Sequence, residues 1–387
     1  MKPQPFRYCI DTPQPGEAIA APFLLLAGWI VSEQGQTISA PTLVGEGRNE
    51  YPLMTVPRPD VEAAFPNSAV LGFQQYISIA DWSDGKACFV RFFLDDRPYN
   101  FDFAWSPSPA AAEKFRQQKR DKLEKIREIL RCPICDSDRL QESGHMLSCQ
   151  DCTAEFSLNP RGYNFLNSKL TEYGKVKPTA NVSANEYDPI AIGIIEQFPD
   201  GLVLDNGSGL RRIYYENVVN FEIVDYPTTD VVGIGEKLPF KSEVFDAVFS
   251  LSVLEHVKNP FECAKEIYRV LKPGGKLYIS VPFLQPFHGY PDHYYNMTSS
   301  GLKNLFPELQ IIESGVPVPG LPIWSLSWFL NSYLRGLPSD VSEKLKNMKI
   351  SELLDSPLAY LKEDFVRQLS PEVNEELAAC NYIIAKK

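Results

Sequence analysis

The chain has 387 residues, 44% of them hydrophobic, which is ordinary for a globular protein and long enough for two or three domains. Its formal net charge of −11 argues against a protein that follows a nucleic-acid backbone, because such a protein needs a cationic surface. The longest apolar run near the start, residues 20–31, is too short to cross a bilayer, and residues 1–17 lack the layout of a signal peptide. We therefore expect a cytoplasmic protein without a transmembrane segment.

Residues 1–110 alternate between apolar and polar positions, as strands with one buried face do. The alternating runs 88–94 and 99–105 are joined by Asp95-Asp96-Arg97-Pro98, which predicts a β-hairpin. Because several similar runs come before them, we predict that residues 1–110 form an all-β sandwich domain.

Short motifs in this segment resemble a module of glycosyltransferases and glycan-modifying methyltransferases. They are Gly28-Trp29, Arg58-Pro59-Asp60-Val61, Phe65-Pro66 and Gly72-Phe73. The resemblance implies a glycan-related role, in which Trp29, Trp82 and Trp105 stack on sugar rings. Packing in the core is the other fate open to these aromatic side chains.

Residues 111–131 contain 8 basic and 4 acidic residues. Their Glu/Lys spacing is typical of a solvated helix. We predict a helical linker that is an exposed spacer.

Four cysteines form two pairs, Cys132-Pro-Ile-Cys135 and Cys149-Gln-Asp-Cys152, with thirteen residues between the pairs. Two such pairs supply four thiolates at the spacing of a tetrahedral zinc site. We predict a structural Zn²⁺ in a ribbon over residues 132–170, because four cysteines leave no open position for catalysis. His145, between the pairs, is interpreted as a surface turn residue. The ribbon resembles the one found before the catalytic domain in a bacterial ribosomal RNA guanine methyltransferase family.

Residues 203–209, Val-Leu-Asp-Asn-Gly-Ser-Gly, predict a strand that turns tightly into a helix and approaches a ligand closely. Residues 220–225 read as a second strand that ends in Asp225, twenty positions after Asp205, where a carboxylate can bind ribose hydroxyls. Arg212 stands where a dinucleotide-binding turn needs its third glycine, so the pattern favours a nucleoside without a pyrophosphate.

Three further motifs make a family resemblance specific: Glu236-Lys-Leu-Pro-Phe240, residues 245–257 with Leu254-Glu-His-Val257, and Arg269-Val-Leu-Lys-Pro-Gly-Gly-Lys-Leu277. With the glycine turn, they are similar to the small-molecule branch of the class I S-adenosylmethionine-dependent methyltransferases. The resemblance covers about residues 200–300. It implies an α/β fold, a doubly wound Rossmann-like sheet, in residues 171–387, with strands and helices in alternation and Pro273-Gly274-Gly275 ending a helix that starts at Asn259-Pro260.

The resemblance also implies roles for individual residues. Asp205, Gly207, Ser208 and Gly209 hold the aminocarboxypropyl group of S-adenosylmethionine, Asp225 the ribose, Gly235 and Glu236 the adenine edge, and Leu251 and Ser252 the floor beneath the sulfonium. Ile234 stands where relatives often carry an acidic residue.

Methyl transfer to a hydroxyl needs a base, and two of the four histidines lie in one loop, residues 286–296. We predict that His288 or His293 removes the proton and that Asp292 orients an imidazole. Alternatively, these groups close the loop over the cofactor and proximity alone drives the transfer.

Two late runs, residues 309–313 and 381–385, predict an antiparallel strand pair, with a helical insertion at about 318–378 between them. Apolar residues at 323, 326, 330, 333 and 334 predict a helix with one buried face. The segment can also pair with another subunit or make a peripheral membrane contact, although it has few basic residues for anionic lipid.

The most direct hypothesis is transfer of a methyl group to a hydroxyl of a sugar or glycan-linked metabolite. Methylation of a ribosomal RNA base and a non-catalytic scaffold are the alternatives. Residues 171–387 hold 20 Lys and Arg against 28 Asp and Glu, a balance that argues against RNA. The sequence leaves the acceptor and the oligomeric state open.

Overall fold

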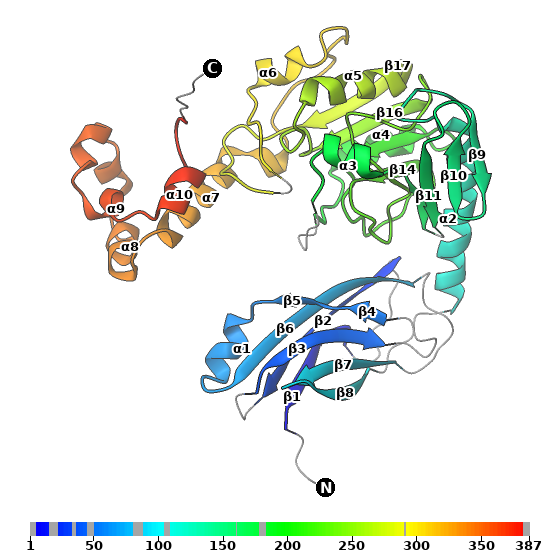
Figure 1. Cartoon of the computed structure of the whole chain (residues 1–387). Helices are drawn as coiled ribbons and strands as arrows, with labels where there is room; N and C mark the ends of the chain where they lie inside the picture. Colours follow the sequence, from blue (N-terminus) through cyan, green and yellow to red (C-terminus); the bar gives the residue numbers. More distant parts are fainter. Residues whose placement is uncertain are drawn as a thin grey trace, which may run out of the picture. The chain divides into compact units, whose positions relative to one another are not determined.

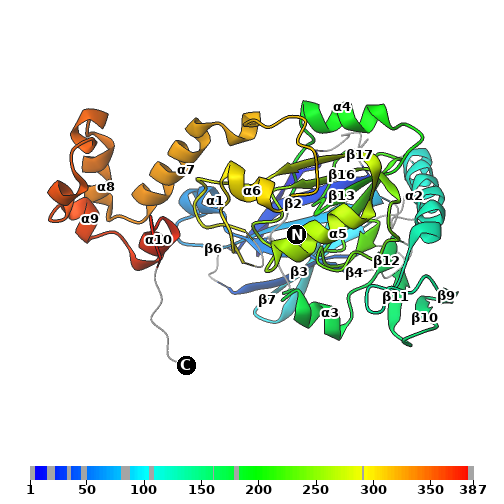
Figure 2. The ribbon, with the colours of Figure 1, turned by 90° about the horizontal axis from the view of Figure 1, so that it is seen from above.

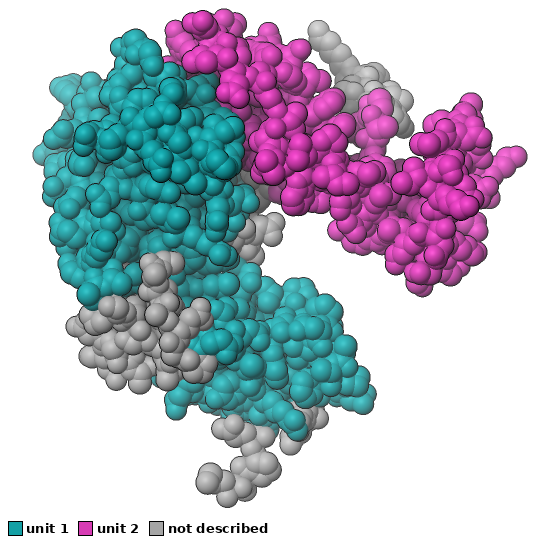
Figure 3. Space-filling view, turned by 180° about the vertical axis from the view of Figure 1, so that it is seen from behind, with its two compact units in different colours: residues 1–249, 269–278 teal, residues 250–268, 279–387 magenta. Residues whose placement is uncertain are grey.

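The computed structural model describes residues 5–14, 22–32, 36–44, 50–79, 88–103, 109–159, 161–177, 183–289 and 292–381. It divides into two compact units, unit 1 with residues 1–249 and 269–278, and unit 2 with residues 250–268 and 279–387 (Figure 3). None of the helices within the described ranges has the length and apolar character needed to cross a membrane.

Two four-stranded antiparallel sheets make up the N-terminal part of unit 1 (Figure 1). Their shared core contains Leu26 and Phe73 from one sheet and Leu43 and Phe92 from the other, all fully buried. The short helix α1 (Pro59–Ala64) comes before β6. The strand order in the first sheet is β1 (Arg7–Thr12), β2 (Phe23–Ser32), β6 (Ala69–Ser78) and β5 (Met54–Val56). The strand order in the second sheet is β4 (Glu50–Pro52), β3 (Ile38–Val44), β7 (Cys88–Leu94) and β8 (Arg97–Phe103).

The predicted hairpin is confirmed, because β7 and β8 pair in antiparallel register from Cys88↔Phe103 to Leu94↔Arg97. Its turn is shorter than predicted: Asp95 and Asp96, with φ of 45° and 65°, form it alone. Positive φ at both positions is the geometry of the tight hairpin turn that follows strand twist. Of the three tryptophans considered for sugar stacking, Trp29 packs against Phe65, while Trp82 and Trp105 lie outside the described residues.

Helix α2 (Pro109–Ile129) spans the predicted linker and lies alongside strands β9–β12 in both views (Figures 1 and 2). The prediction of an exposed spacer is wrong on one face, where the side chains of Lys119 and Lys122 are 3% and 1% exposed. The Lys122 ammonium lies 3.1 Å from a carboxylate oxygen of Asp230, which is itself fully buried. A buried lysine needs an acidic partner, and Asp230 provides it. Because this face of α2 is buried, the helix belongs to the packed body of unit 1.

A nine-stranded sheet continues unit 1 in the order β17-β16-β13-β14-β15-β12-β11-β10-β9. The pairs β16–β13, β13–β14, β14–β15 and β15–β12 are parallel. The pairs from β12 to β9 are antiparallel. These four strands, which belong to the cysteine-containing segment, therefore continue the parallel sheet without a break. The bounds are β9 (Leu140–Ser143), β10 (Met146–Cys149), β11 (Glu155–Asn159), β12 (Gly162–Asn164), β13 (Val203–Asn206), β14 (Val218–Glu222), β15 (Val231–Val232), β16 (Phe245–Leu251) and β17 (Leu271–Ser280).

The strand order reverses between β13 and β16, and ligands of open α/β sheets bind outside the strand ends at such a point. Helices α3 (Ser168–Tyr173) and α4 (Pro189–Gln197) precede β13, and α5 (Pro260–Val270) follows β16. The predicted helix start at Pro260 is confirmed, but the helix ends before Pro273-Gly274-Gly275, which lie within β17. The predicted helix after the glycine turn is absent from the fully described connection 207–217, because Arg211 folds back onto Asp205 there.

The C-terminal part of unit 2 contains α6 (Ser299–Asn304), α7 (Pro322–Arg335), α8 (Ser339–Lys346), α9 (Asp364–Arg367) and α10 (Pro371–Glu376). Helix α7 forms as predicted, but its predicted buried face is wrong: Ile323 is 65% and Leu326 52% exposed. The predicted strand 309–313 is also wrong, since these residues are irregular and Ile312 is 87% exposed. A strand needs a paired neighbour. Of its predicted partner 381–385, only Asn381 lies inside the described residues.

Candidate functional site

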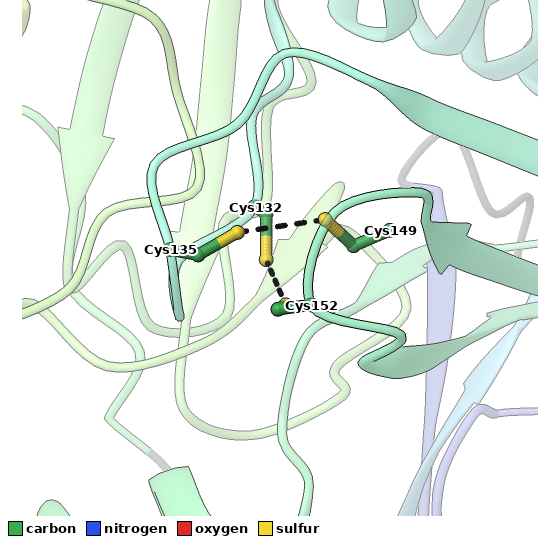
Figure 4. A group of neighbouring side chains, drawn as sticks. All are labelled: Cys132, Cys135, Cys149 and Cys152. Atoms are coloured by element: carbon green, nitrogen blue, oxygen red, sulfur yellow. Dashed lines mark hydrogen bonds between the residues drawn. The ribbon is translucent and has the colours of Figure 1, made fainter.

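The four paired cysteines come together as the sequence predicts. Cys132, Cys135, Cys149 and Cys152 each offer a sulfur, and these four atoms lie within 4.8 Å of one another. Figure 4 shows the sulfurs converging, with Sγ–Sγ distances of 3.6 Å for Cys132–Cys152 and 3.5 Å for Cys135–Cys149. Four sulfurs bound to zinc at about 2.3 Å in a tetrahedron lie roughly 3.8 Å apart, so the spacing fits the metal.

The two cysteine turns have the same backbone geometry. Asp136 and Thr153, each following the second cysteine of its pair, have φ of 63° and 58°. The N–H of each donates to the carbonyl of the first cysteine, with N···O distances of 2.9 and 3.0 Å. This repetition leaves all four thiols directed at one point. His145 is exposed in the turn between β9 and β10, next to Gly144.

Asp205 lies at the end of β13 and is fully buried. Its Oδ2 accepts a hydrogen bond from the Tyr187 hydroxyl at 2.5 Å and from the Arg211 Nε at 2.9 Å. Its Oδ1 is buried and has no partner among the described residues. A buried acceptor without a donor costs free energy, so this oxygen is suited to a donor from a ligand.

The glycine-rich turn follows directly. Gly207 and Gly209 have φ of 83° and 61°, and the N–H groups of Gly207 and Ser208 both donate to the Phe221 carbonyl. A side chain on Gly209 would collide with the Ser183 carbonyl as well as strain the backbone. The turn is therefore held tightly against β14, with room only for glycine.

The carboxylate nearest this turn is one that the sequence analysis missed. Glu222 ends β14, its Oε2 accepts from the Gly209 N–H at 2.8 Å, and its Oε1 accepts from the Ile223 N–H at 2.7 Å. Burial raises the pKa of the Glu222 carboxyl. Asp225 lies three residues beyond the strand and 3.2 Å from the Arg161 guanidinium. The strand β14 begins two residues earlier than predicted and therefore ends at Glu222 rather than at Asp225. The apolar pair Val218-Val219 was the signal for this earlier start.

The residues predicted for the adenine follow β15, and those predicted for the sulfonium lie at the end of β16. Ile234 and Glu236 follow β15 and are 2% and 5% exposed. Gly235 lies between them, in a stretch anchored by the hydrogen bond from the Gly233 N–H to the Glu222 carbonyl. Leu251 is the last residue of β16, and Ser252 follows with a φ of 56°.

Three histidines cluster in unit 2. The ring centroids of His256 and His288 are 5.1 Å apart, and those of His288 and His293 are 4.4 Å apart. His256 comes from the segment after β16, whereas His288 and His293 come from the loop after β17. The backbone N–H groups of Tyr294 and Tyr295 donate to the Glu255 carbonyl, which fixes the loop against this segment.

The hydrogen bonds give the two loop histidines different roles. His293 Nδ1 accepts from the His288 backbone N–H at 3.2 Å, and its Nε2 lies 2.9 Å from Asn296 Oδ1, so both nitrogens are engaged. His288 Nδ1 lies 2.8 Å from the Pro286 carbonyl, and its Nε2 has no hydrogen-bond partner among the described residues. The Asp292 backbone carbonyl lies 2.9 Å from His256 Nδ1, and the Asp292 carboxylate accepts from the Tyr294 hydroxyl. The base assignment of the sequence analysis stays a prediction.

Glu255 completes the cluster and was also missed as a candidate. It is fully buried, and neither carboxylate oxygen has a hydrogen-bond partner within the described residues. Desolvation raises the pKa of Glu255 to about 8 and lowers the pKa of His256. The motif Leu254-Glu255-His256 was the available signal, but it did not reveal that the glutamate is buried.

Comparison with known proteins identifies the α/β region. Residues 214–279 match the family described as a methyltransferase domain. Cycloartenol-C-24-methyltransferase 1 of Oryza sativa subsp. japonica is 53% identical over 38 residues, 10% of this chain and 11% of that protein. The tRNA U34 carboxymethyltransferase of Desulfotalea psychrophila is 36% identical over 69 residues, 17% of this chain and 21% of that protein. The chain thus spans about a tenth and a fifth of these curated relatives.

Among solved structures, Haemonchus contortus phosphoethanolamine N-methyltransferase 2 in complex with S-adenosyl-L-methionine is 19% identical, and the match covers 45% of this chain and 49% of that chain. Its TM-score of 0.26 is too low to support a structural argument. The family match and the strand order together support an α/β methyltransferase domain in this part of the chain.

Proposed function

We propose that this protein transfers a methyl group from S-adenosylmethionine to a hydroxyl oxygen of a sugar or glycan-linked metabolite. The observation that carries the proposal is the match of residues 214–279 to the methyltransferase domain. Beside it lies the glycine turn, where the buried Asp205 Oδ1 has no hydrogen-bond partner within the described residues. The sugar acceptor is supported by the motifs of the N-terminal β-sandwich, which are similar to those of glycan-modifying enzymes. A hydroxyl acceptor is supported by the cluster of polar residues around His288.

The described residues fit S-adenosylmethionine. Asp205 Oδ1 would accept from the amino group of the cofactor, and the backbone of Gly207 and Gly209 would let the aminocarboxypropyl chain approach closely. We assign the ribose hydroxyls to Glu222 rather than Asp225, because Glu222 ends the strand and contacts the turn. Gly235 and Glu236 would face the adenine, and Leu251 and Ser252 the sulfonium.

We also propose that the four cysteines bind one structural Zn²⁺. The site is closed by four thiolates, so it contributes folding free energy and takes no part in the methyl transfer. Its sulfurs come from the turn that precedes β9 and the turn at the end of β10, so the metal would tie the β9–β10 hairpin to the segment that follows α2.

A second candidate is methylation of a tRNA or ribosomal RNA base. It is favoured by the similarity to a tRNA U34 carboxymethyltransferase and by the ribbon itself. The excess of acidic over basic residues in residues 171–387 opposes it, since RNA affinity needs cationic side chains.

The test is a screen of acceptor classes with cofactor labelled in its methyl group: sugars and nucleotide sugars, oligosaccharides, tRNA and ribosomal RNA. We expect label transfer to a sugar hydroxyl and none to RNA. Robust methylation of RNA would replace the glycan proposal. Tight cofactor binding without transfer to any class would support the scaffold alternative, and no cofactor binding would overturn the site assignment.

A further inference from the structure

Three side chains of unit 2 form a group with the composition of a metal site. Glu255, His256 and His288 each offer one ligand atom, and these atoms lie within 4.8 Å of one another. The His256 Nε2 and a Glu255 carboxylate oxygen are 3.8 Å apart. Ligand atoms bound at about 2.1 Å to one cation lie roughly 3 to 4 Å apart, so small side-chain movements would complete the coordination.

The hydrogen bonds of both histidines prepare them as ligands. Each Nδ1 faces a backbone carbonyl oxygen, that of Asp292 for His256 and that of Pro286 for His288, at 2.9 and 2.8 Å. A carbonyl oxygen only accepts, so Nδ1 carries the proton and Nε2 keeps a free lone pair. Metal-binding histidines have this arrangement in almost every site, with the second nitrogen donating to a carbonyl or a carboxylate.

The glutamate supplies an independent observation. Glu255 is fully buried, and neither carboxylate oxygen has a hydrogen-bond partner among the described residues, although His256 and His288 lie close to it. Burying an unpaired carboxylate is unfavourable, and a cation at this point would offset the cost. A histidine that served only to fill the core would not require a buried glutamate beside it.

The backbone maintains the close approach of the two segments. Gly289 has a φ of 88°, and a Cβ built on it would overlap the ring of His256. Only glycine fits there, so the peptide next to His288 lies directly against the His256 imidazole. This contact sets the distance between the two histidines.

We propose that Glu255, His256 and His288 bind a divalent transition-metal cation that holds the acceptor hydroxyl. Two imidazoles and one carboxylate favour a transition metal over Mg²⁺, which prefers oxygen ligands and keeps several waters. Three protein ligands leave coordination positions open for a substrate, in contrast to the four-cysteine site. The binding of the cation is independent of the proposed function, whereas its role in catalysis rests on that function.

The cation would act as a Lewis acid toward the acceptor. The hydroxyl oxygen binds the metal, its O–H bond becomes more acidic, and the proton passes to water. The alkoxide then forms the new bond to the methyl carbon while the carbon–sulfur bond of the cofactor breaks, so the sulfonium leaves as a neutral thioether. His288 is thereby a metal ligand in place of a proton acceptor.

The test is a titration of the full-length, zinc-loaded protein with Co²⁺, whose visible d–d absorption reports coordination. We expect one Co²⁺ per chain beyond the zinc, with nitrogen and oxygen ligands and without the intense thiolate charge-transfer bands of a cysteine site. Glu255→Gln and His288→Ala should each weaken binding by more than about 100-fold, since even outer-shell changes cost 10- to 100-fold. The matched control His145→Ala removes an exposed histidine outside the cluster and should bind Co²⁺ normally.

Further measurements distinguish misfolding, loss of the metal site and failure of the proposed function. Glu255→Gln is isosteric, and its thermal unfolding and S-adenosylhomocysteine affinity should stay near those of the parent, so a loss of Co²⁺ binding would not reflect misfolding. Three results would overturn the metal site. The zinc-loaded protein takes up no Co²⁺, both variants bind Co²⁺ as tightly as the parent, or the site binds Mg²⁺ in preference to Co²⁺. Co²⁺ binding without methyl transfer to any acceptor would instead contradict the proposed function. Full activity in a chelator that leaves the cysteine-bound zinc in place would remove the metal from catalysis.

Discussion

The substitution Glu222→Gln tests whether Glu222 or Asp225 binds the ribose hydroxyls of the proposed cofactor. Glu222 accepts two backbone hydrogen bonds, from Gly209 at 2.8 Å and Ile223 at 2.7 Å. In the Gln variant one of these N–H groups faces an amide NH₂, and the ribose loses an anionic acceptor. A hydrogen bond to a charged group contributes about 1.5–3 kcal/mol, so cofactor affinity should fall by roughly 10- to 150-fold.

Asp225→Asn is the matched control for this exchange. Its carboxylate lies 3.2 Å from the Arg161 guanidinium, with the two side chains 31% and 34% exposed, and a partly exposed pair contributes about 0–1 kcal/mol. Cofactor affinity should therefore change by less than about 5-fold.

Calorimetric titration with S-adenosylhomocysteine measures both variants without turnover. Thermal unfolding of the unliganded proteins reports any loss of the glycine turn, and Glu222→Asp tests whether the negative charge alone suffices. Normal affinity in Glu222→Gln together with a large loss in Asp225→Asn would refute the assignment and restore the one made from the sequence.

Three further predictions concern the remainder of unit 1. Cys149→Ser should abolish the one zinc per chain found by elemental analysis and lower the unfolding temperature with cofactor affinity unchanged, and full metal content in the variant would contradict the cysteine site. Burial lowers the pKa of Lys122 to about 8, below its usual 10.5. Between these values the unfolded chain binds more protons, so the free energy of unfolding should rise with pH from about 8 to 10.5, by up to about 1.4 kcal/mol per unit, and Lys122→Met should flatten this slope in denaturant titrations. Asp96→Gly should raise the free energy of unfolding by about 0.5 kcal/mol by relieving a positive φ, whereas Asp102→Gly, inside β8, should lower it; the opposite order in denaturant titrations would count against the turn geometry.

Features that depend on neighbours in the sequence could be predicted from it. The two Cys-x-x-Cys turns and the β7–β8 hairpin have local geometry, and each appears where its motif stands. The end of β14 depends on pairing with β13 and β15, so the sequence placed it three residues late and selected Asp225 over Glu222.

Features set by distant partners could not be predicted. The Glu/Lys pattern of α2 indicates an exposed helix, and nothing near Lys119 or Lys122 in the sequence identifies Asp230, about a hundred residues away, as their buried partner. The period of α7 predicts a helix correctly, yet a period does not say whether the apolar face is covered. Likewise, the loop after β17 contacts Glu255 through the N–H groups of Tyr294 and Tyr295, and the Leu-Glu-His motif does not encode this distant contact.

The continuity of the nine-stranded sheet has a practical consequence for anyone who wishes to study the methyltransferase domain by itself. A fragment starting at residue 171 would lack β12 and Phe165, which follows it. The N–H groups of Tyr163 and Phe165 donate to the backbone carbonyls of Asp230 and Val232. The hydrogen-bonding edge of β15, whose residues Val231 and Val232 are buried in the full chain, would then lack its partner strand. Exposed strand edges of this kind recruit other chains, so such a fragment is expected to aggregate however well its own active site is formed. A fragment for such work should begin before α2, so that β12 to β9 and the two cysteine turns remain with the sheet.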